Sequence, residues 1–371
     1  MMNKKRVPKI CFILPNLNVG GAERVVMNII NSLDKGKVNI YLVVIDKIGQ
    51  LKGLIPTHVH VVNLNVTRTR FSFSKMYSAI NKIKPDLLFS STNRTNILVL
   101  GIALFLRFKP KIVIREPNSP YAQFKLKQLP NYYLFLIKLL YRRATAIIAQ
   151  TDSMKAEIQK YFKIPEEKIS VIMNTVDYRY IDKMVQAGKK PYPVGSINII
   201  ASGRICKQKG FDFLIKSFRQ VIDQNSNYKL FIIGNDDDKK YKKKLDELID
   251  KSELNNFVFL QGFQENPYPY YKYADLFVLS SCWEGLPNVV LEALYLKTPV
   301  IVTNCIPFFK QIIKEGKNGF IVEFGDEIDL AKKIMKHGDL KIIRNITYQF
   351  DYTKKFSELI SNKGMQGGTS A

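Results

Sequence analysis

Residues 276–293 read LFVLSSCWEGLPNVVLEA, and this stretch decides the fold class. It opens with Leu276–Leu279, an unbroken apolar run typical of a strand that is buried on both faces. A loop with Gly285 and Pro287 follows, and helical periodicity begins near Asn288. The pattern predicts a strand, a loop and a helix in succession, which is the repeating unit of a parallel sheet covered by helices.

Two glutamates in this stretch stand eight positions apart. Glu284 lies on the loop, and Glu292 lies one turn into the helix, inside the apolar run Val289–Leu294. Carboxylates accept hydrogen bonds from hydroxyl groups, and the N–H groups at a helix N-terminus bind phosphate. Two surface glutamates are the plain alternative. The apolar setting of Glu292 argues against it, because a carboxylate among apolar residues needs partners.

Short apolar runs alternate with helical patterns along the whole chain of 371 residues. A clear helical stripe covers Ala22–Leu33. We expect two series of strands, at Ile10–Leu14, Ile40–Ile45, Asp86–Phe89, Lys111–Ile114 and Ala146–Ala149, and then at Ile197–Ala201, Leu230–Ile233, Phe257–Leu260, Leu276–Leu279, Pro299–Val302 and Phe320–Val322. The predicted fold class is α/β with parallel sheets.

Glycine and proline breaks separate the two series, at Gly188, Pro191 and Pro193. We therefore expect an N-terminal Rossmann-like domain at 1–175, a linker at 176–195, a C-terminal Rossmann-like domain at 196–350, and a C-terminal helix and tail at 351–371. Two such domains would face each other across a cleft. Parallel sheets bind ligands beyond the carboxyl ends of their strands, so the cleft is the expected site.

Two further loops follow a predicted strand and precede a predicted helix. The first contains Gly20 and Gly21, which would let the backbone approach a ligand closely, although an ordinary tight turn explains them equally well. The second, at 202–210, contains Arg204 and Lys209. A planar guanidinium and a point charge suit a diphosphate, and the position at a strand's carboxyl end favours that site over two solvated side chains.

The charge is strongly positive and unevenly distributed. The chain has 57 Lys and Arg against 32 Asp and Glu, a net charge of +25, of which residues 1–180 contribute +19 and residues 181–371 contribute +6. The positive charge of residues 1–180 favours an anionic partner. The plain alternative is a lysine-rich, solvated surface. Three histidines and four scattered cysteines predict neither a metal site nor a disulfide framework. No apolar run is long enough to span a membrane, so we expect a cytoplasmic protein.

The segment 132–143 is rich in aromatic and aliphatic residues and ends in Arg142 and Arg143. This composition is typical of a helix that lies on a membrane surface, and an ordinary core helix explains it equally well. We expect peripheral association of the N-terminal domain with an anionic inner-membrane surface. Nucleic acid is not an expected partner, because no nucleic-acid-binding module is recognisable.

Taken together, these motifs resemble a known family. The resemblance rests on the E-x7-E spacing of the two glutamates, the basic loop and the first glycine turn, that is, on Glu284, Glu292, Gly203, Arg204, Lys209, Gly210, Gly20 and Gly21. The chain is similar to retaining glycosyltransferases of the GT4 group, of the bacterial surface-polysaccharide type. The likeness runs from the first strand to Val322. It implies a GT-B fold, with the nucleotide-sugar in the C-terminal domain and the acceptor in the N-terminal domain.

The resemblance also implies residue roles. Glu292 would bind the ribose hydroxyls, Arg204 and Lys209 the diphosphate, and Glu284 a donor-sugar hydroxyl. Other residues would line the nucleotide-sugar or offer it backbone amides, namely Gly20, Gly21, Gly203, Gly262, Leu286, Pro287, Asn288 and Val289. No metal and no cofactor besides the nucleotide-sugar are implied, and a UDP-sugar is favoured by analogy.

Two stretches depart from the family pattern. Many relatives have a histidine after the fourth N-terminal strand, where this chain has Arg115, Glu116 and Asn118 around Pro117. One of those three would then contact the sugar or the acceptor. The usual Gly-Gly-x-x-Glu after the strand at 299–302 is replaced by Cys305–Lys310.

The sequence thus predicts a metal-independent retaining hexosyltransferase in cell-surface polysaccharide biosynthesis. It would move a hexose or N-acetylhexosamine from a nucleotide-sugar to a glycan or a lipid-linked oligosaccharide. Fixed cations would stabilise the departing diphosphate, and no protein nucleophile is apparent. The alternatives are a non-enzymatic basic protein that binds a membrane or nucleic acid, and a GT-B-fold sugar-nucleotide epimerase. An epimerase would need carboxylates and histidines that the first domain does not offer.

Overall fold

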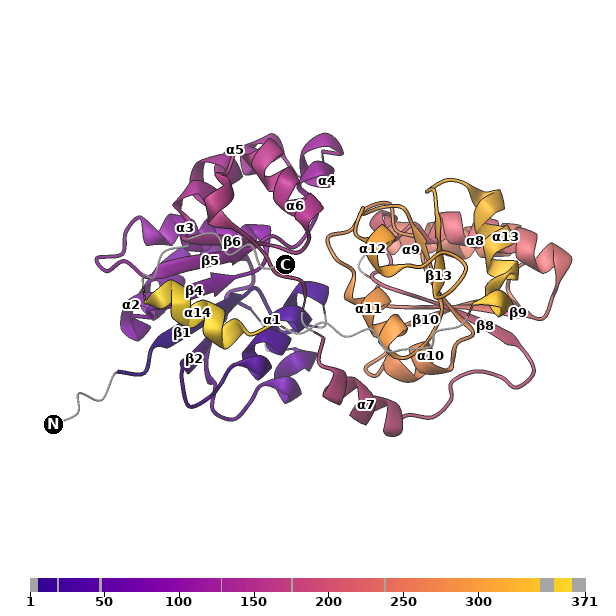
Figure 1. The fold of residues 1–371 in the computed structure, drawn as a ribbon, viewed down its shortest axis with the longest axis horizontal. Coiled ribbons are helices and arrows are strands. Elements are labelled where there is room, and N and C mark those ends of the chain that lie inside the picture. Colours follow the sequence, from indigo (N-terminus) through magenta and orange to yellow (C-terminus); the bar gives the residue numbers. More distant parts are fainter. Residues whose placement is uncertain are drawn as a thin grey trace. The chain divides into compact units, whose positions relative to one another are not determined.

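The computed structural model describes residues 6–18, 20–46, 49–127, 129–174, 176–236, 238–340 and 350–361. The chain divides into two compact units, which are shown in Figure 1: unit 1 comprises 1–175 and 348–371, and unit 2 comprises 176–347. Each unit is built on one parallel sheet with helices beside it. This confirms the predicted α/β class.

Unit 1 contains a seven-stranded sheet in the order β3-β2-β1-β4-β5-β6-β7. Its strands are β1 (Lys9–Leu14), β2 (Asn39–Val44), β3 (His60–Asn63), β4 (Leu87–Ser90), β5 (Lys111–Arg115), β6 (Ala146–Ala149) and β7 (Ile169–Val171). The five strands predicted in this part of the chain are confirmed. The prediction missed β3 and β7, which are short and form the two edges of the sheet, where partial exposure removes the long apolar run that marks a central strand.

Both faces of this sheet are buried. Along β1, Ile10, Phe12 and Leu14 belong to one apolar cluster, whereas Cys11 and Ile13 belong to another. This is the alternation that a strand imposes on its side chains. The covering helices are α1 (Gly21–Ser32), α2 (Phe73–Ile83), α3 (Asn93–Ala103), α4 (Pro120–Lys125), α5 (Asn131–Leu140), α6 (Asp152–Glu157) and α14 (Tyr352–Ile360).

Helix α14 comes from the far end of the chain and packs on the N-terminal sheet (Figure 1, yellow). The ring of Phe356 lies 5.7 Å from that of Phe89 and 6.2 Å from that of Phe12. The Asp34 amide donates to the Thr353 hydroxyl at 3.0 Å. The C-terminal helix predicted within 351–371 is therefore present and belongs to unit 1, and the predicted tail lies outside the described residues.

Unit 2 contains a six-stranded sheet in the order β10-β9-β8-β11-β12-β13. The strands are β8 (Ile197–Ser202), β9 (Tyr228–Ile233), β10 (Val258–Gly262), β11 (Leu276–Leu279), β12 (Val300–Thr303) and β13 (Gly319–Val322), and all six were predicted. The helices are α7 (Tyr178–Gln186), α8 (Phe211–Gln224), α9 (Lys239–Lys251), α10 (Tyr268–Tyr273), α11 (Asn288–Tyr295), α12 (Phe309–Ile312) and α13 (Glu327–Met335).

The segment expected to be a linker, 176–195, carries helix α7 and is part of unit 2. The ring of Tyr178 lies 4.4 Å from that of Tyr295, whose hydroxyl donates to Asp182 at 2.8 Å. The glycine and proline residues of this segment indicated a linker. Instead, α7 is an amphipathic helix, and one of its faces is buried against unit 2.

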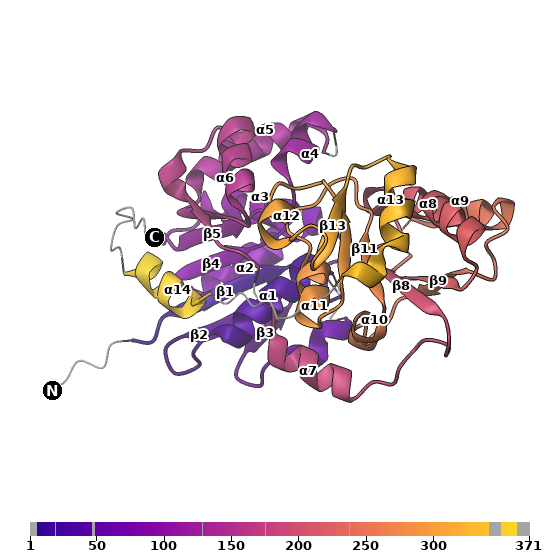
Figure 2. The same cartoon turned by 45° about the vertical axis from the view of Figure 1, so that its right-hand side comes forward.

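In each sheet, successive strands are first added toward one edge and then, from one point on, toward the other edge. In unit 2 the chain runs outward from β8 through β9 to β10, and then returns to place β11, β12 and β13 on the other side of β8. The loops after β8 and β11 therefore flank a topological switch point, where open α/β sheets bind ligands. In unit 1 the corresponding point lies between β1 and β4. Figure 2 gives a second view of both sheets.

Candidate functional site

The loops after β8 and β11 are joined by a buried ion pair. Lys209 ends a short 3-10 turn, and its Nζ lies 2.7 Å from Oε1 of Glu284, with side-chain exposures of 13% and 10%. The hydroxyl of Ser281 donates to the same Oε1 at 2.7 Å. Two residues that were predicted from separate motifs, 75 positions apart, are thus direct partners at the switch point.

Backbone contacts hold the same two loops together. The Cys282 amide donates to the Gln208 carbonyl at 2.8 Å, and the Gln208 side chain donates to the Trp283 carbonyl at 2.9 Å. Gly210 has a left-handed φ of +59°, and a Cβ there would lie 2.2 Å from the carbonyl oxygen of Ser280. Glycine is therefore required at this position, both by its backbone angle and by the close approach.

Arg204 occupies the same loop and is exposed. Its guanidinium donates to the Gln208 side chain at 3.4 Å. Gly203 precedes it, and the Gly203 amide donates to the Ile233 carbonyl at 3.0 Å. This bond attaches the start of the loop to β9, so that the guanidinium emerges at the carboxyl end of the sheet, as the sequence predicted.

Helix α11 begins at Asn288, four residues after Glu284. Asn288 and Val289 form its first turn, where backbone N–H groups point away from the helix, and Leu286 and Pro287 lead into it. Glu292 follows in the second turn and is only 3% exposed. The structure therefore places the second glutamate in a buried setting, as its apolar neighbours indicated.

Gly262 ends β10, and its carbonyl accepts from the Gly234 amide at 2.8 Å. It is exposed, and one strand, β9, separates β10 from β8.

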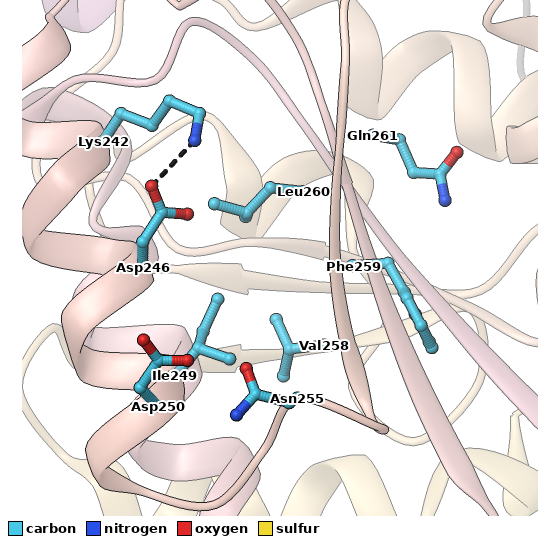
Figure 3. A pocket seen from close by; sticks show the side chains of 9 residues that line it. All are labelled: Lys242, Asp246, Ile249, Asp250, Asn255, Val258, Phe259, Leu260 and Gln261. Carbon is cyan, nitrogen blue, oxygen red and sulfur yellow. Dashed lines mark hydrogen bonds and ion pairs between the residues drawn. The ribbon is translucent and has the colours of Figure 1, made fainter.

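A cavity of ≈ 320 Å³ lies between α9 and this edge strand (Figure 3). It is lined by Lys242, Asp246, Ile249, Asp250, Asn255, Val258, Phe259, Leu260 and Gln261. Its lysine is already paired with Asp246 at 2.8 Å. Two carboxylates beside a single lysine do not suit a diphosphate. The switch point has Arg204 and the N-terminus of α11 besides its paired lysine, so we favour it as the anion-binding site.

The glycine turn of unit 1 lies at the start of α1, directly after β1. Gly20 is extended, with φ −141°, so its backbone angle does not require glycine. A Cβ on Gly20 would meet the Glu23 carboxylate at 2.2 Å, whereas a Cβ on Gly21 would have nothing within 4 Å. The turn sits at the unit 1 switch point, and its open side leaves the backbone accessible.

Arg115, at the end of β5, is buried inside unit 1. Its Nη1 donates to the Ser91 hydroxyl at 3.1 Å and its Nη2 donates to the Asn174 carboxamide oxygen. Its Nε has no hydrogen-bond partner among the described residues. Burial lowers the pKa of this guanidinium to about 10. Arg115 thus holds the ends of β4 and β5 and the chain after β7 together.

Glu116 is completely buried and surrounded by donors. Its Oε1 accepts from Gln123 at 2.6 Å and from Asn93 at 3.1 Å, and its Oε2 accepts from the Tyr141 hydroxyl at 3.2 Å. Burial raises the pKa of this carboxyl to about 7, although the hydrogen bonds oppose the shift. Of the three residues predicted on the acceptor side, Asn118 alone is partly exposed, because the side chains of Arg115 and Glu116 point into unit 1.

The partners of Glu116 escaped the sequence analysis. Asn93 and Gln123 are single polar residues within helical patterns, and neither stands out by spacing. Tyr141 lies in the aromatic segment 132–143, and the structure buries it fully, with its hydroxyl donating to Glu116. One signal was available: Glu116 directly follows an apolar strand, where a carboxylate needs donors.

The stretch Cys305–Lys310, which departs from the family pattern, packs inward. Ile306, Phe308 and Phe309 are buried. Among the described residues, no group of three or more His, Cys, Asp or Glu side chains is placed to hold a metal ion.

Comparison with known proteins places both units in one group of enzymes. Residues 19–180 match the model of Glycosyltransferase Family 4, and residues 183–346 match that of Glycosyl transferases group 1. Each model covers most of one unit, and together they show that the chain is a GT4-like glycosyltransferase. The resemblance to GT4 glycosyltransferases that the motifs indicated is thereby confirmed.

Curated relatives include an uncharacterized glycosyltransferase of Methanocaldococcus jannaschii, 36% identical over 62% of this chain and 58% of the relative, so that the match spans less than two thirds of that protein. A second is a Campylobacter jejuni N-acetylgalactosaminyltransferase named for a diacetylbacillosaminyl-diphospho-undecaprenol acceptor. It is 26% identical over 86% of this chain and 87% of its own.

Solved structures share the fold over nearly the whole chain. HepE of Anabaena, determined with UDP and glucose, aligns with a TM-score of 0.74 and 19% identity over 96% of this chain and 93% of its own. A sucrose-phosphate synthase of Thermosynechococcus elongatus aligns with a TM-score of 0.71 and 16% identity, over 89% of both chains. These likenesses confirm the GT-B fold of the chain.

Proposed function

We propose that this glycosyltransferase moves a hexose or N-acetylhexosamine from a UDP-sugar to a glycan or lipid-linked oligosaccharide, with retention of configuration, in cell-surface polysaccharide biosynthesis. The observation that carries the proposal is the buried Lys209–Glu284 pair at the switch point of unit 2. UDP is supported by the nucleotide bound to HepE, and a lipid-linked acceptor by the name of the Campylobacter relative.

The chemistry requires stabilisation of a leaving group. When the sugar–phosphate bond breaks, negative charge grows on the departing diphosphate, and fixed donors aimed at it lower the barrier. The loop after β8 has three cations, Arg204, Lys207 and Lys209, of which we assign Arg204 and Lys209 to the diphosphate. The first turn of α11 adds backbone N–H groups. These groups take the part that a metal ion plays in other transferases, so we propose a metal-independent reaction.

Glu284 is suited to orient the sugar. Both of its described contacts, from Lys209 and Ser281, go to Oε1. Oε2 is then the oxygen that would accept from a donor-sugar hydroxyl. Glu292, buried one turn into α11, would accept from the ribose hydroxyls.

Retention follows if the acceptor hydroxyl attacks from the face that the diphosphate leaves. In this mechanism the C–O bond to the acceptor forms as the bond to the diphosphate breaks, and the hydroxyl proton passes to a phosphate oxygen. The acceptor would bind on unit 1, at the inner face of the membrane, with Asn118 on the acceptor side.

The test begins with a thermal-shift screen of UDP-, GDP- and ADP-sugars on the full chain. We expect a UDP-sugar to stabilise the protein. The enzyme is then incubated with that UDP-sugar and a lipid-linked acceptor in the presence of EDTA. NMR of the product should show the same anomeric configuration as the donor.

Three outcomes would contradict parts of the proposal. Turnover that is lost in EDTA and restored by magnesium or manganese contradicts metal independence. An inverted product contradicts the retaining mechanism, and interconversion of the nucleotide-sugar without an acceptor favours the epimerase.

A further inference from the structure

Positive charge in this chain is concentrated in one stretch of unit 1. Residues 47–151 contain 17 Lys and Arg but only two acidic residues, Asp86 and Glu116. Glu116 is completely buried, and Asp86 accepts from the Lys9 amide at 2.7 Å and pairs with Arg6 at 3.4 Å. The stretch itself therefore supplies almost no exposed negative charge. One carboxylate from outside it, Glu157, accepts from the Ser119 hydroxyl at 2.7 Å and from the Tyr121 amide at 2.9 Å.

The same stretch holds most of the exposed apolar side chains. Within the described residues, ten of the sixteen large hydrophobic side chains that are exposed fall in 47–151. A soluble surface of this kind is normally rich in charge of both signs, and a concentration of exposed apolar residues indicates an interaction site.

Helix α5 presents the clearest part of this surface. Its inner face is formed by Leu134 and Ile137, which are buried. On the opposite side, Tyr132, Phe135 and Leu139 recur at helical spacing and are 62%, 65% and 54% exposed. The outer position of a surface helix is normally polar, so this helix has a second apolar face that unit 1 does not cover. Figures 1 and 2 both show α5 on the outside of unit 1.

Cations stand at both ends of this face. Lys125 and Lys127 precede α5, and Arg142 and Arg143 follow it, and all four are exposed. None of the four takes part in an ion pair within the described residues. The sequence left open whether this segment is a core helix or an interfacial helix. In the structure, one face of α5 packs in the core and the opposite face is exposed and apolar, as in an interfacial helix.

We propose that the outer face of α5, with its flanking cations, docks on an anionic lipid bilayer. The exposed aromatic and aliphatic side chains of α5, flanked by positive charges, match the structure of an anionic bilayer. Tyr and Phe insert at the boundary between headgroups and acyl chains, while Lys and Arg remain among the headgroups. A second protein surface would need a large acidic patch. None of the described helices is long and apolar enough to cross a membrane, so docking would be peripheral.

Docking would give the enzyme access to a lipid-linked acceptor. This consequence rests on the proposed function, whereas docking itself does not. Docking itself requires neither donor nor acceptor. It is therefore measured separately from transfer, and UDP-sugar binding in the absence of lipid shows whether the donor site is intact.

The experiment is flotation of the full-length protein with vesicles of phosphatidylcholine containing either no phosphatidylglycerol or 30 mol% of it, at low and high salt. The wild type should bind the anionic vesicles and lose binding as salt rises. Each cation near the surface contributes roughly fivefold, so Arg142→Gln/Arg143→Gln should weaken binding about 25-fold. Phe135→Gln/Leu139→Gln should weaken binding about tenfold or more.

Matched controls lie in unit 2. Lys239→Gln/Lys240→Gln removes the same charge from the start of α9, where both lysines are exposed. Ile328→Gln removes an exposed apolar residue that is comparable to Phe135. Both controls should bind vesicles like the wild type, and circular dichroism confirms that every variant is folded.

Three results would overturn the proposal. The first is a wild type that does not bind anionic vesicles. The second is equal loss in the unit 2 controls, which would show attraction by net charge alone. The third is a change in oligomeric state by light scattering in Phe135→Gln/Leu139→Gln with unaltered vesicle binding, which would make the face a contact between copies of the chain.

Discussion

The Lys209–Glu284 pair allows structural and chemical roles to be separated by a double-mutant cycle. The changes are Lys209→Met, Glu284→Gln and the two together. Lys209→Met leaves a carboxylate at 10% exposure with Ser281 as its described donor. Glu284→Gln keeps an oxygen that the ammonium can still reach. The two single variants therefore differ in the charge that they leave unpaired.

The expected magnitudes follow from burial. Removing one partner of a buried pair costs about 3 kcal/mol, so we expect this loss for Lys209→Met. Glu284→Gln exchanges a charge-assisted hydrogen bond for a weaker one and should cost about 1–2 kcal/mol. With neither charge present the double variant should lose only about 1–2 kcal/mol, giving a coupling energy of about 3 kcal/mol.

The chain offers its own probe for this measurement. Trp283 is the only tryptophan and directly precedes Glu284, so its fluorescence reports urea unfolding of unit 2 beside the pair. Lys242→Met serves as the control. It breaks an exposed pair with Asp246, 2.8 Å long, and should cost less than about 1 kcal/mol. Transfer rates are measured on the same four variants.

In the double variant, stability should recover in part while transfer activity does not. We expect it to regain about half of the stability lost in Lys209→Met while transfer stays abolished, because neither the cation nor the carboxylate is present. If transfer returns with stability, the pair serves only to hold the two loops together. If Lys209→Met is as stable as Lys242→Met, burial does not penalise the carboxylate that is left unpaired.

Three other predictions concern single positions. Glu292→Gln should weaken UDP binding about 10- to 150-fold by calorimetry, the value of one charge-assisted hydrogen bond, and an unchanged affinity would remove Glu292 from the site. Gly210→Ala and Gly316→Ala both place alanine at a left-handed φ, +59° and +71°, and should share a cost of about 1–2 kcal/mol. Gly210→Ala alone meets a carbonyl oxygen at 2.2 Å, so it should lose about 1–3 kcal/mol more in urea unfolding, and equal losses would contradict the close approach. The pKa of Glu116, raised by burial to about 7, means that the folded chain binds more protons than the unfolded chain between about pH 4.5 and 7. Stability should fall by about 3 kcal/mol as pH rises through that window, and urea unfolding of Glu116→Gln at pH 5 and 8 should lack this slope.

Much of the architecture could be predicted from the sequence because its signals are local. Each central strand is a buried apolar run, and each such run can be read without knowing its neighbours. The same holds for the loop of Arg204 and Lys209, whose place between a strand and a helix indicated an anion site before any contact was known. Edge strands such as β3 escaped because partial exposure weakens the apolar pattern. Helix α7 escaped because the glycine and proline breaks that follow it indicated a linker.

Tertiary structure decided which residues meet. Nothing in the spacing of Lys209 and Glu284 shows that their side chains pair, because that contact depends on β8 and β11 being neighbours in the sheet. The return of α14 to unit 1 and the burial of Glu116 among Asn93, Gln123 and Tyr141 have the same origin. A periodic pattern specifies how one segment folds, whereas pairing, burial and the pKa of a carboxyl depend on segments far apart in the chain that the packed fold alone brings together.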